Sequence, residues 1–92
     1  MRVHVTGPAS ADIDATFRFL TERSPHAARA TRTAIRNAIL SLRQMPLRGR
    51  SSVAPGTREI VVPKTPYVIV YDVKPEAVRI LRIRHVSQDP SP

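Results

Sequence analysis

The chain has 92 residues, a formal net charge of +8, 41% hydrophobic residues and only 4% aromatic residues, which allows one domain with a small aliphatic core. The absence of cysteine excludes disulfides, thiolate catalysis and thiolate metal sites. No apolar run approaches the ~18 residues of a membrane span, so the sequence favours a soluble, cytoplasmic protein whose positive charge suits a polyanionic partner.

A short strand and a helix are expected first along the chain. Residues 2–6 (RVHVT) alternate in polarity with period two, which predicts a strand. Gly7 and Pro8 are expected to end this strand, and Ser10 is expected to cap a helix that ends near Arg23. The apolar face of this helix consists of Ile13, Phe17 and Leu20.

A second helix is predicted from Ser24 as N-cap and Pro25 at the first helical position, and Pro46 is expected to end it. Its apolar stripe contains several alanines, which favour close packing against the first helix in an antiparallel hairpin. The opposite face is assigned to solvent and carries Arg29, Arg32, Arg36 and Arg43.

The second half of the chain predicts a loop followed by an antiparallel meander. Residues 46–56 are rich in Pro, Gly and Ser, which is typical of a loop. Short turns then separate three expected strands, residues 57–62, 67–73 and 77–86. The predicted fold is α+β with the order β-α-α-β-β-β, in which the helical hairpin packs on one face of a small, mainly antiparallel sheet. Residues 1–88 form the single predicted domain, and residues 89–92 are expected to be a disordered tail.

Arginines alternate with aliphatic residues in the last strand, so strict period-two alternation predicts its two faces. One face would carry Arg79, Leu81, Ile83 and His85, and the other Ile80, Arg82, Arg84 and Val86. Leu81 and Ile83 are expected under the helices, which leaves Arg82 and Arg84 on the open side of the sheet. Arg58 could join Arg82 there, although the register between strands is not readable from the sequence.

These residues raise the hypothesis of RNA cleavage. His85 offers an acid or base, and Arg58, Arg82 and Arg84 offer cations for a phosphorane. A second proton-transfer group is difficult to identify, because Glu59 alternates to the opposite side of its strand from Arg58. Without a glycine-rich phosphate loop or a paired-histidine motif, neither a cofactor nor a metal ion is expected.

Several segments together resemble one known group of proteins, the RelE/ParE superfamily of toxins from type II toxin–antitoxin systems, also called plasmid-stabilisation proteins. The resemblance covers nearly the whole chain and implies the same order of elements. It rests on the combination of "ASADIDATFRFL" (9–20), "AIRNAILSLRQMPLRGR" (34–50), "PGTREIVVPKTPYVIVYDV" (55–73) and "VRILRIRHVSQD" (78–89).

The superfamily implies one of two targets. RelE-like members resemble ribosome-dependent mRNA endonucleases, whereas ParE-like members act on DNA gyrase without cleaving RNA. Basic residues that RelE-like nucleases often carry are replaced here by Val68 and Val86, and their terminal aromatic residue is replaced by the tail 90–92. The resemblance therefore favours a gyrase inhibitor rather than an enzyme. The alternatives are an mRNA endonuclease that uses His85 and an inactive module that only binds an antitoxin.

The resemblance also implies a partner, a cognate antitoxin whose acidic C-terminal segment wraps around the toxin in a hetero-oligomeric complex. The +8 charge suits such a segment, and no membrane partner is expected. Candidate contacts with the antitoxin or the target are the cations Arg50, Arg58, Arg82 and Arg84 and the apolar residues Phe19 and Val61.

Overall fold

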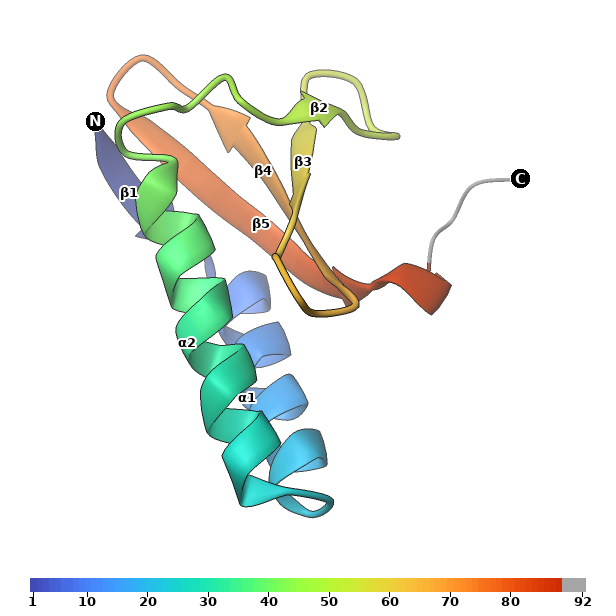
Figure 1. Ribbon diagram of the computed structural model, residues 1–92. Coiled ribbons are helices and arrows are strands. Elements are labelled where there is room, and N and C mark those ends of the chain that lie inside the picture. Colours follow the sequence, from blue (N-terminus) through green and yellow to red (C-terminus); the bar gives the residue numbers. More distant parts are fainter. Residues whose placement is uncertain (89–92) are drawn as a thin grey trace.

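A computed structural model describes residues 1–88, and Figure 1 shows the arrangement of its elements. The predicted disordered tail, residues 89–92, lies outside the described residues. The elements are β1 (Arg2–Val5), α1 (Gly7–Thr21), α2 (Pro25–Ser41), β2 (Arg50–Ser51), β3 (Arg58–Val61), β4 (Tyr67–Val73), β5 (Ala77–His85) and a 3₁₀ turn, η1 (Val86–Gln88).

The strands form one five-stranded sheet in the order β1-β5-β4-β3-β2. β1 runs parallel to β5, and the other neighbours are antiparallel. The predicted α+β class, the helical hairpin and the mainly antiparallel sheet are confirmed. β2 was not predicted, because a strand of two residues is too short to show a period within the loop of residues 46–56.

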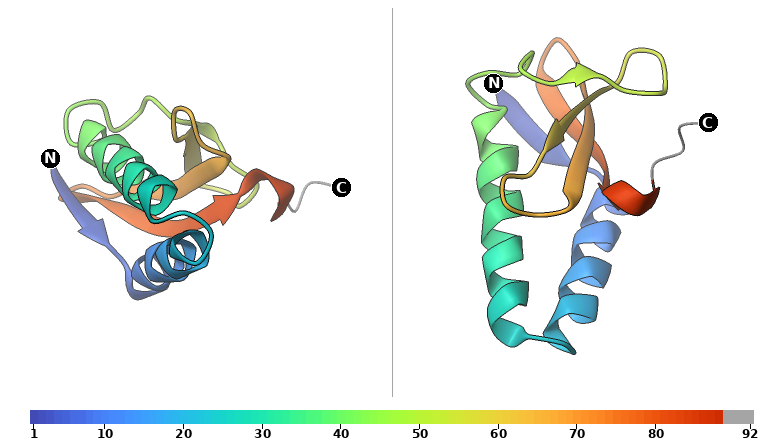
Figure 2. Two further views of the ribbon diagram at one scale, coloured as in Figure 1. Left: turned by 60° about the horizontal axis from the view of Figure 1, so that its bottom comes forward. Right: turned by 45° about the vertical axis from the view of Figure 1, so that its right-hand side comes forward.

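The two helices pack against different parts of the sheet (Figure 2). Ile35 and Ile39 of α2, and Leu42 at its C-cap, lie in the same buried cluster as the aliphatic residues of β3, β4 and β5. α1 runs beside β5 beyond the end of β1, and Asp12 there accepts a hydrogen bond from the backbone N–H of Ile83 at 2.9 Å. α1 thus covers an edge of β5 that would otherwise expose unpaired backbone groups. No helix within residues 1–88 has the length and apolar character needed to cross a membrane.

The start of α1 differs from the prediction. The helix begins at Gly7, Pro8 lies in its first turn, and the Thr6 hydroxyl accepts a hydrogen bond from the backbone N–H of Ala9. Proline is tolerated at this place because the first helical N–H groups have no intrahelical acceptor. Ser10 is therefore an exposed residue inside the helix and not its cap. The predicted cap at Ser24, with Pro25 following, is confirmed.

A β-bulge in β5 overturns the predicted division of that strand into two faces. Val70 of β4 pairs with Arg82, but its neighbour Tyr71 pairs with Ile80, so Leu81 is an extra residue. Side chains alternate between the two faces on each side of a bulge, but the extra residue reverses which face the odd-numbered and even-numbered positions occupy. Ile80 and Ile83 consequently both lie in the core, at 0% and 5% exposure, and Leu81 does not. The outward-facing arginines of β5 are Arg79, Arg82 and Arg84.

Tyr71 fixes the loop that leads from α2 to β2. Its buried hydroxyl donates to the carbonyl of Pro46 at 2.8 Å and accepts from the N–H of Gly49 at 2.9 Å. A side chain at Gly49 would come within 2.5 Å of that hydroxyl. Glycine is therefore needed here for close approach, and the loop holds Arg50 beside β3.

Candidate functional site

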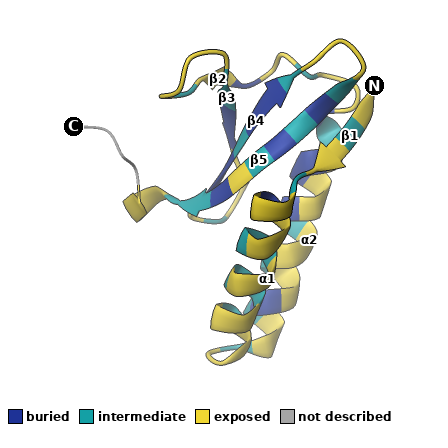
Figure 3. Ribbon diagram, turned by 180° about the vertical axis from the view of Figure 1, so that it is seen from behind, coloured by how far each residue is buried: buried dark blue, intermediate teal, exposed yellow. Residues whose placement is uncertain are grey.

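The side of the sheet that faces away from α2 gathers most of the charged side chains singled out in the sequence. We call it the outer sheet face. The pairing of the strands places on it Arg50, Glu59, Val61, Val68, Val70, Asp72, Arg79, Arg82 and Arg84. Arg82 and Arg84 thus lie on the predicted side. Figure 3 shows that buried and partly buried positions alternate in the first part of β5, whereas β4 is mostly buried.

Glu59 is the centre of the first ionic cluster on this face. Its carboxylate accepts hydrogen bonds from Arg84 at 3.0 Å, from Arg50 at 2.9 Å and from the Ser52 hydroxyl at 2.8 Å. The side chains of Glu59 and Arg84 are only 7% and 15% exposed. Burial alone would raise the pKa of Glu59, but the hydrogen bonds from Arg50 and Ser52 and the charge of Arg84 together hold that pKa below its usual value. The mostly buried ion pair with Glu59 therefore gives Arg84 a structural role.

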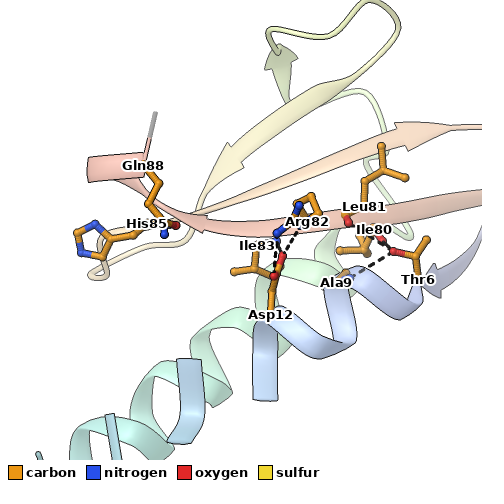
Figure 4. Close-up of polar contacts among 9 residues, drawn as sticks. All are labelled: Thr6, Ala9, Asp12, Ile80, Leu81, Arg82, Ile83, His85 and Gln88. Carbon is orange, nitrogen blue, oxygen red and sulfur yellow. Dashed lines mark hydrogen bonds and ion pairs between the residues drawn. The ribbon is translucent and has the colours of Figure 1, made fainter. Parts of the chain in front are cut away.

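Arg82 forms a second pair, across the boundary between the sheet and α1. Its guanidinium donates to both carboxylate oxygens of Asp12, at 2.7 and 3.1 Å, as Figure 4 shows. The hydrogen bonds from Arg82 to Asp12 raise the pKa of the guanidinium. Because the same carboxylate also binds the N–H of Ile83, Asp12 joins α1 to β5 through both a side chain and the backbone.

Arg79 and Asp72 form a third pair on the outer sheet face. The guanidinium donates to the two carboxylate oxygens at 2.9 and 2.6 Å, and Lys74 lies 3.9 Å from the same carboxylate. The hydrogen bond from Arg79 lowers the pKa of Asp72, although burial acts in the opposite direction. Every arginine that β5 presents outward thus has a carboxylate partner, which reduces the cationic field expected on this face.

The sequence-predicted residues do not form one site. Arg58 is opposite Tyr71, on the inner side of the sheet, and donates to the carbonyls of Leu47 and Gly49 at 3.2 and 2.8 Å. It therefore does not join Arg82, which the sequence had left open as a possibility. Val61 is 52% exposed on the outer sheet face, whereas Phe19 is 50% exposed on α1, where Arg23 lies 3.6 Å above its ring. These two apolar residues belong to different surfaces.

His85 lies on the inner side of β5, apart from Arg82 and Arg84. Figure 4 shows its ring well removed from the Arg82–Asp12 pair. Its Nδ1 accepts a hydrogen bond from the backbone N–H of Ser87 at 3.0 Å, with the Ser87 hydroxyl 2.8 Å away. A backbone N–H can only donate, so Nδ1 carries the lone pair and the proton of the neutral ring is on Nε2. In this arrangement the ring offers a donor to a ligand, while the nitrogen that could act as a base is already occupied.

His85 also borders a cleft between the helical hairpin and the end of the sheet, which we call the hairpin cleft. Its volume is about 610 Å³. The ring of Tyr67 meets His85 edge to face, with centroids 5.4 Å apart. The lining residues are Ala15, Thr16, Phe19, Leu20, Thr31, Pro66, Tyr67, Ile83, His85, Ser87 and Gln88. The mixture of apolar walls and a few polar groups suits a peptide segment.

The carboxylate partners of Arg79 and Arg82 were not predicted from the sequence. These partners are Asp72 and Asp12. Asp12 and Arg82 are 70 positions apart, so no local pattern connects them. Among residues 1–88, no three histidines or carboxylates lie close enough together to hold a metal ion.

Comparison with known proteins agrees with this architecture. Residues 3–90 match the family model for the ParE toxin of the type II toxin–antitoxin system parDE. Toxin RelE2 of Caulobacter vibrioides is 39% identical over 83 residues, which cover 90% of this chain and 92% of the relative. Toxin RelE1 of the same organism is 39% identical over 85 residues, with 90% of each chain covered.

Two solved structures are similar in fold. A chain of the chromosomal ParDE toxin–antitoxin system from P. aeruginosa superposes with a TM-score of 0.83 at 28% identity, over 92% of this chain and 95% of the other. A chain of the toxin–antitoxin complex RelBE2 from Mycobacterium tuberculosis gives 0.62 at 22% identity, over 91% and 95%. Together with the family match, these similarities show that the chain belongs to the ParE toxin family of type II toxin–antitoxin systems.

Proposed function

We propose that this toxin inhibits growth by acting on DNA gyrase and that a cognate antitoxin neutralises it. The proposal rests on how the residues that could cleave RNA are paired and placed. Arg82 and Arg84 are bound to Asp12 and Glu59, and His85 lies on the other side of the sheet with Nδ1 occupied. An endonuclease needs free cations and a proton acceptor at one phosphate, and this arrangement favours inhibition by binding.

A supercoiling assay with purified gyrase and relaxed plasmid tests this proposal. Micromolar toxin is expected to slow supercoiling, and prior addition of the antitoxin is expected to restore the rate. The antitoxin can be sought among the small reading frames next to the gene of this chain. Unchanged supercoiling with folded toxin would argue against gyrase as the target.

A second candidate is ribosome-dependent mRNA cleavage, which the names of the two RelE relatives favour. In this case translated mRNA would acquire new ends with codon spacing, mapped by primer extension, and His85→Ala would remove them. The third alternative, an inactive antitoxin-binding module, predicts unimpaired growth when the toxin is expressed without antitoxin. The three outcomes are distinct, so one set of assays separates them.

The hairpin cleft is the surface that we propose for the antitoxin. Phe19 is exposed at its wall beside Arg23, which offers an apolar contact next to a cation for an acidic segment. Phe19→Ala is expected to weaken antitoxin binding at least tenfold in calorimetry, because aromatic anchors dominate such interfaces. Val61→Ala is the matched control, since Val61 is equally exposed but lies on the outer sheet face. Equal losses of antitoxin affinity in the two variants would contradict the hairpin cleft as the antitoxin site.

A further inference from the structure

The positive charge of this chain is concentrated in one segment. Residues 23–58 contain no acidic residue, whereas the rest of the chain has seven basic and seven acidic residues and is neutral overall. The whole net charge of +8 therefore comes from this segment. Its eight basic residues are all arginines: Arg23, Arg29, Arg32, Arg36, Arg43, Arg48, Arg50 and Arg58.

Four of these arginines follow one line along the outside of the molecule. Arg29, Arg32 and Arg36 lie within about 60° around the axis of α2 at 3.6 residues per turn, and Arg43 follows in the turn after the helix. At 1.5 Å per residue the line is about 20 Å long. All four are exposed, and Arg32 and Arg36 lie on the side of α2 that borders α1 and β1. We call Arg29, Arg32, Arg36 and Arg43 the α2 arginine face.

The α2 arginine face differs from the outer sheet face because none of its four charges is in an ion pair with a carboxylate of the described residues. Within residues 1–88, the ion pairs involve Arg50, Lys74, Arg79, Arg82 and Arg84, and none involves this face. Of the four, Arg32 alone contacts an aromatic ring in the described part of the chain, with its guanidinium 5.1 Å from the ring centroid of Phe17. Free guanidinium groups are suited to bidentate contacts with phosphate.

We propose that the α2 arginine face binds the phosphate backbone of a double-stranded nucleic acid, independently of sequence. Duplex DNA carries one phosphate charge per ~1.7 Å of its axis, so a line of about 20 Å faces many phosphates. Single-strand binding normally adds aromatic side chains on which bases stack. Tyr67 and Tyr71 are buried in the core, and α2 has no aromatic residue. The surface therefore suits a continuous backbone better than unpaired bases, and this binding does not depend on gyrase being the target.

Fluorescence anisotropy with a labelled 20-base-pair duplex of arbitrary sequence tests the proposal, using duplex DNA and duplex RNA as separate probes. The key variant is Arg29→Gln/Arg36→Gln/Arg43→Gln, which keeps Arg32 on Phe17. The matched control is Arg2→Gln/Arg18→Gln/Lys64→Gln, which removes the same charge from exposed positions outside the segment. A third variant, Arg29→Lys/Arg36→Lys/Arg43→Lys, preserves the charge.

The toxin alone is expected to bind a duplex with a strong salt dependence. Each lost phosphate contact lowers the slope of log affinity against log salt by about 1, so the key variant should lose about 3 from this slope and at least tenfold in affinity at 100 mM salt. The control and the lysine variant should stay within about threefold of the wild type. A preference for DNA or for RNA identifies which duplex is bound, and either result supports the proposal.

Two results would overturn it. Equal losses in the key variant and the control would mean that net charge alone attracts the duplex. The second result is that a 20-residue polyglutamate peptide binds more tightly than either duplex and that the key variant loses affinity for this peptide. It would assign the face to an acidic protein segment. Circular dichroism melting of each variant checks that the differences do not come from unfolding.

Discussion

The outer sheet face and the α2 arginine face are both rich in arginine, yet their arginines have different surroundings. On the outer sheet face Arg79, Arg82 and Arg84 are each within 3.0 Å of a carboxylate. On α2 the arginines have no carboxylate partner among residues 1–88. A basic residue on a basic protein is therefore not by itself a binding residue. The paired arginines hold the sheet and α1 together, and the unpaired ones supply the external field.

Among the variants that test this difference, Glu59→Gln is expected to change stability most. Glu59→Gln removes the charge that compensates Arg84, which is mostly buried. The free energy of unfolding is expected to fall by about 2 kcal/mol, measured by urea denaturation. Glu76→Gln is the control, because Glu76 is exposed in the β4–β5 turn and should change stability by less than about 0.5 kcal/mol. Equal values for the two variants would show that the outer sheet face is not held by its ion pairs.

A smaller effect is expected at Asp12, which binds Arg82 and the backbone N–H of Ile83. Asp12→Ala should cost about 1–2 kcal/mol, since it leaves the N–H at the edge of β5 without its acceptor. Asp14→Ala removes an exposed carboxylate of the same helix and serves as the control. Amide hydrogen exchange at Ile83 should also accelerate in Asp12→Ala alone. Unchanged exchange there would contradict the assigned link between α1 and β5.

The pH dependence of stability provides a further test. The pKa values of Glu59 and Asp72 are lowered in the folded chain, and their values in the unfolded chain are about 4.3 and 3.9. Their stabilisation is therefore complete above about pH 5 and is lost as pH falls through the lowered folded values. Glu59→Gln/Asp72→Asn should flatten the loss of stability between about pH 5 and 3. A curve parallel to the wild type would contradict the two pKa directions.

The smallest change in stability is expected on the α2 arginine face. Arg29→Gln/Arg36→Gln/Arg43→Gln removes exposed charges without ion-pair partners in the described chain. Its unfolding free energy should stay within about 0.5 kcal/mol of the wild type. A loss comparable to that of Glu59→Gln would mean that these arginines also have a structural role, and the contrast between the two faces would disappear.

Most of the fold follows from local patterns in the sequence. The cap at Ser24 with Pro25, the period of α2 and the turns between β3, β4 and β5 are each local, and each was predicted. The bulge at Leu81 was not, because the alternation of residues 78–85 looks the same with or without an extra residue. Because of this one extra residue, Ile80 lies in the core and Arg79 lies on the outer sheet face, the reverse of the prediction.

The site was less predictable than the fold, because it depends on contacts between distant segments. Arg82 and Arg84 were correctly placed on the outer side of β5, but their partners Asp12 and Glu59 come from α1 and β3. A sequence shows which residues carry charge, and only the packed chain shows which charges are already paired. The same limit applies to His85, whose Nδ1 is occupied by the backbone of the turn that follows it.

Growth after induced expression of His85→Ala without antitoxin separates the two modes of action, because inhibition by binding does not require His85 and cleavage does. Growth arrest equal to that of the wild type is predicted, with His26→Ala as the matched exposed histidine. If His85→Ala relieves the arrest while its circular dichroism melting matches that of the wild type, and His26→Ala does not relieve it, His85 is part of a catalytic site and inhibition by binding alone is contradicted.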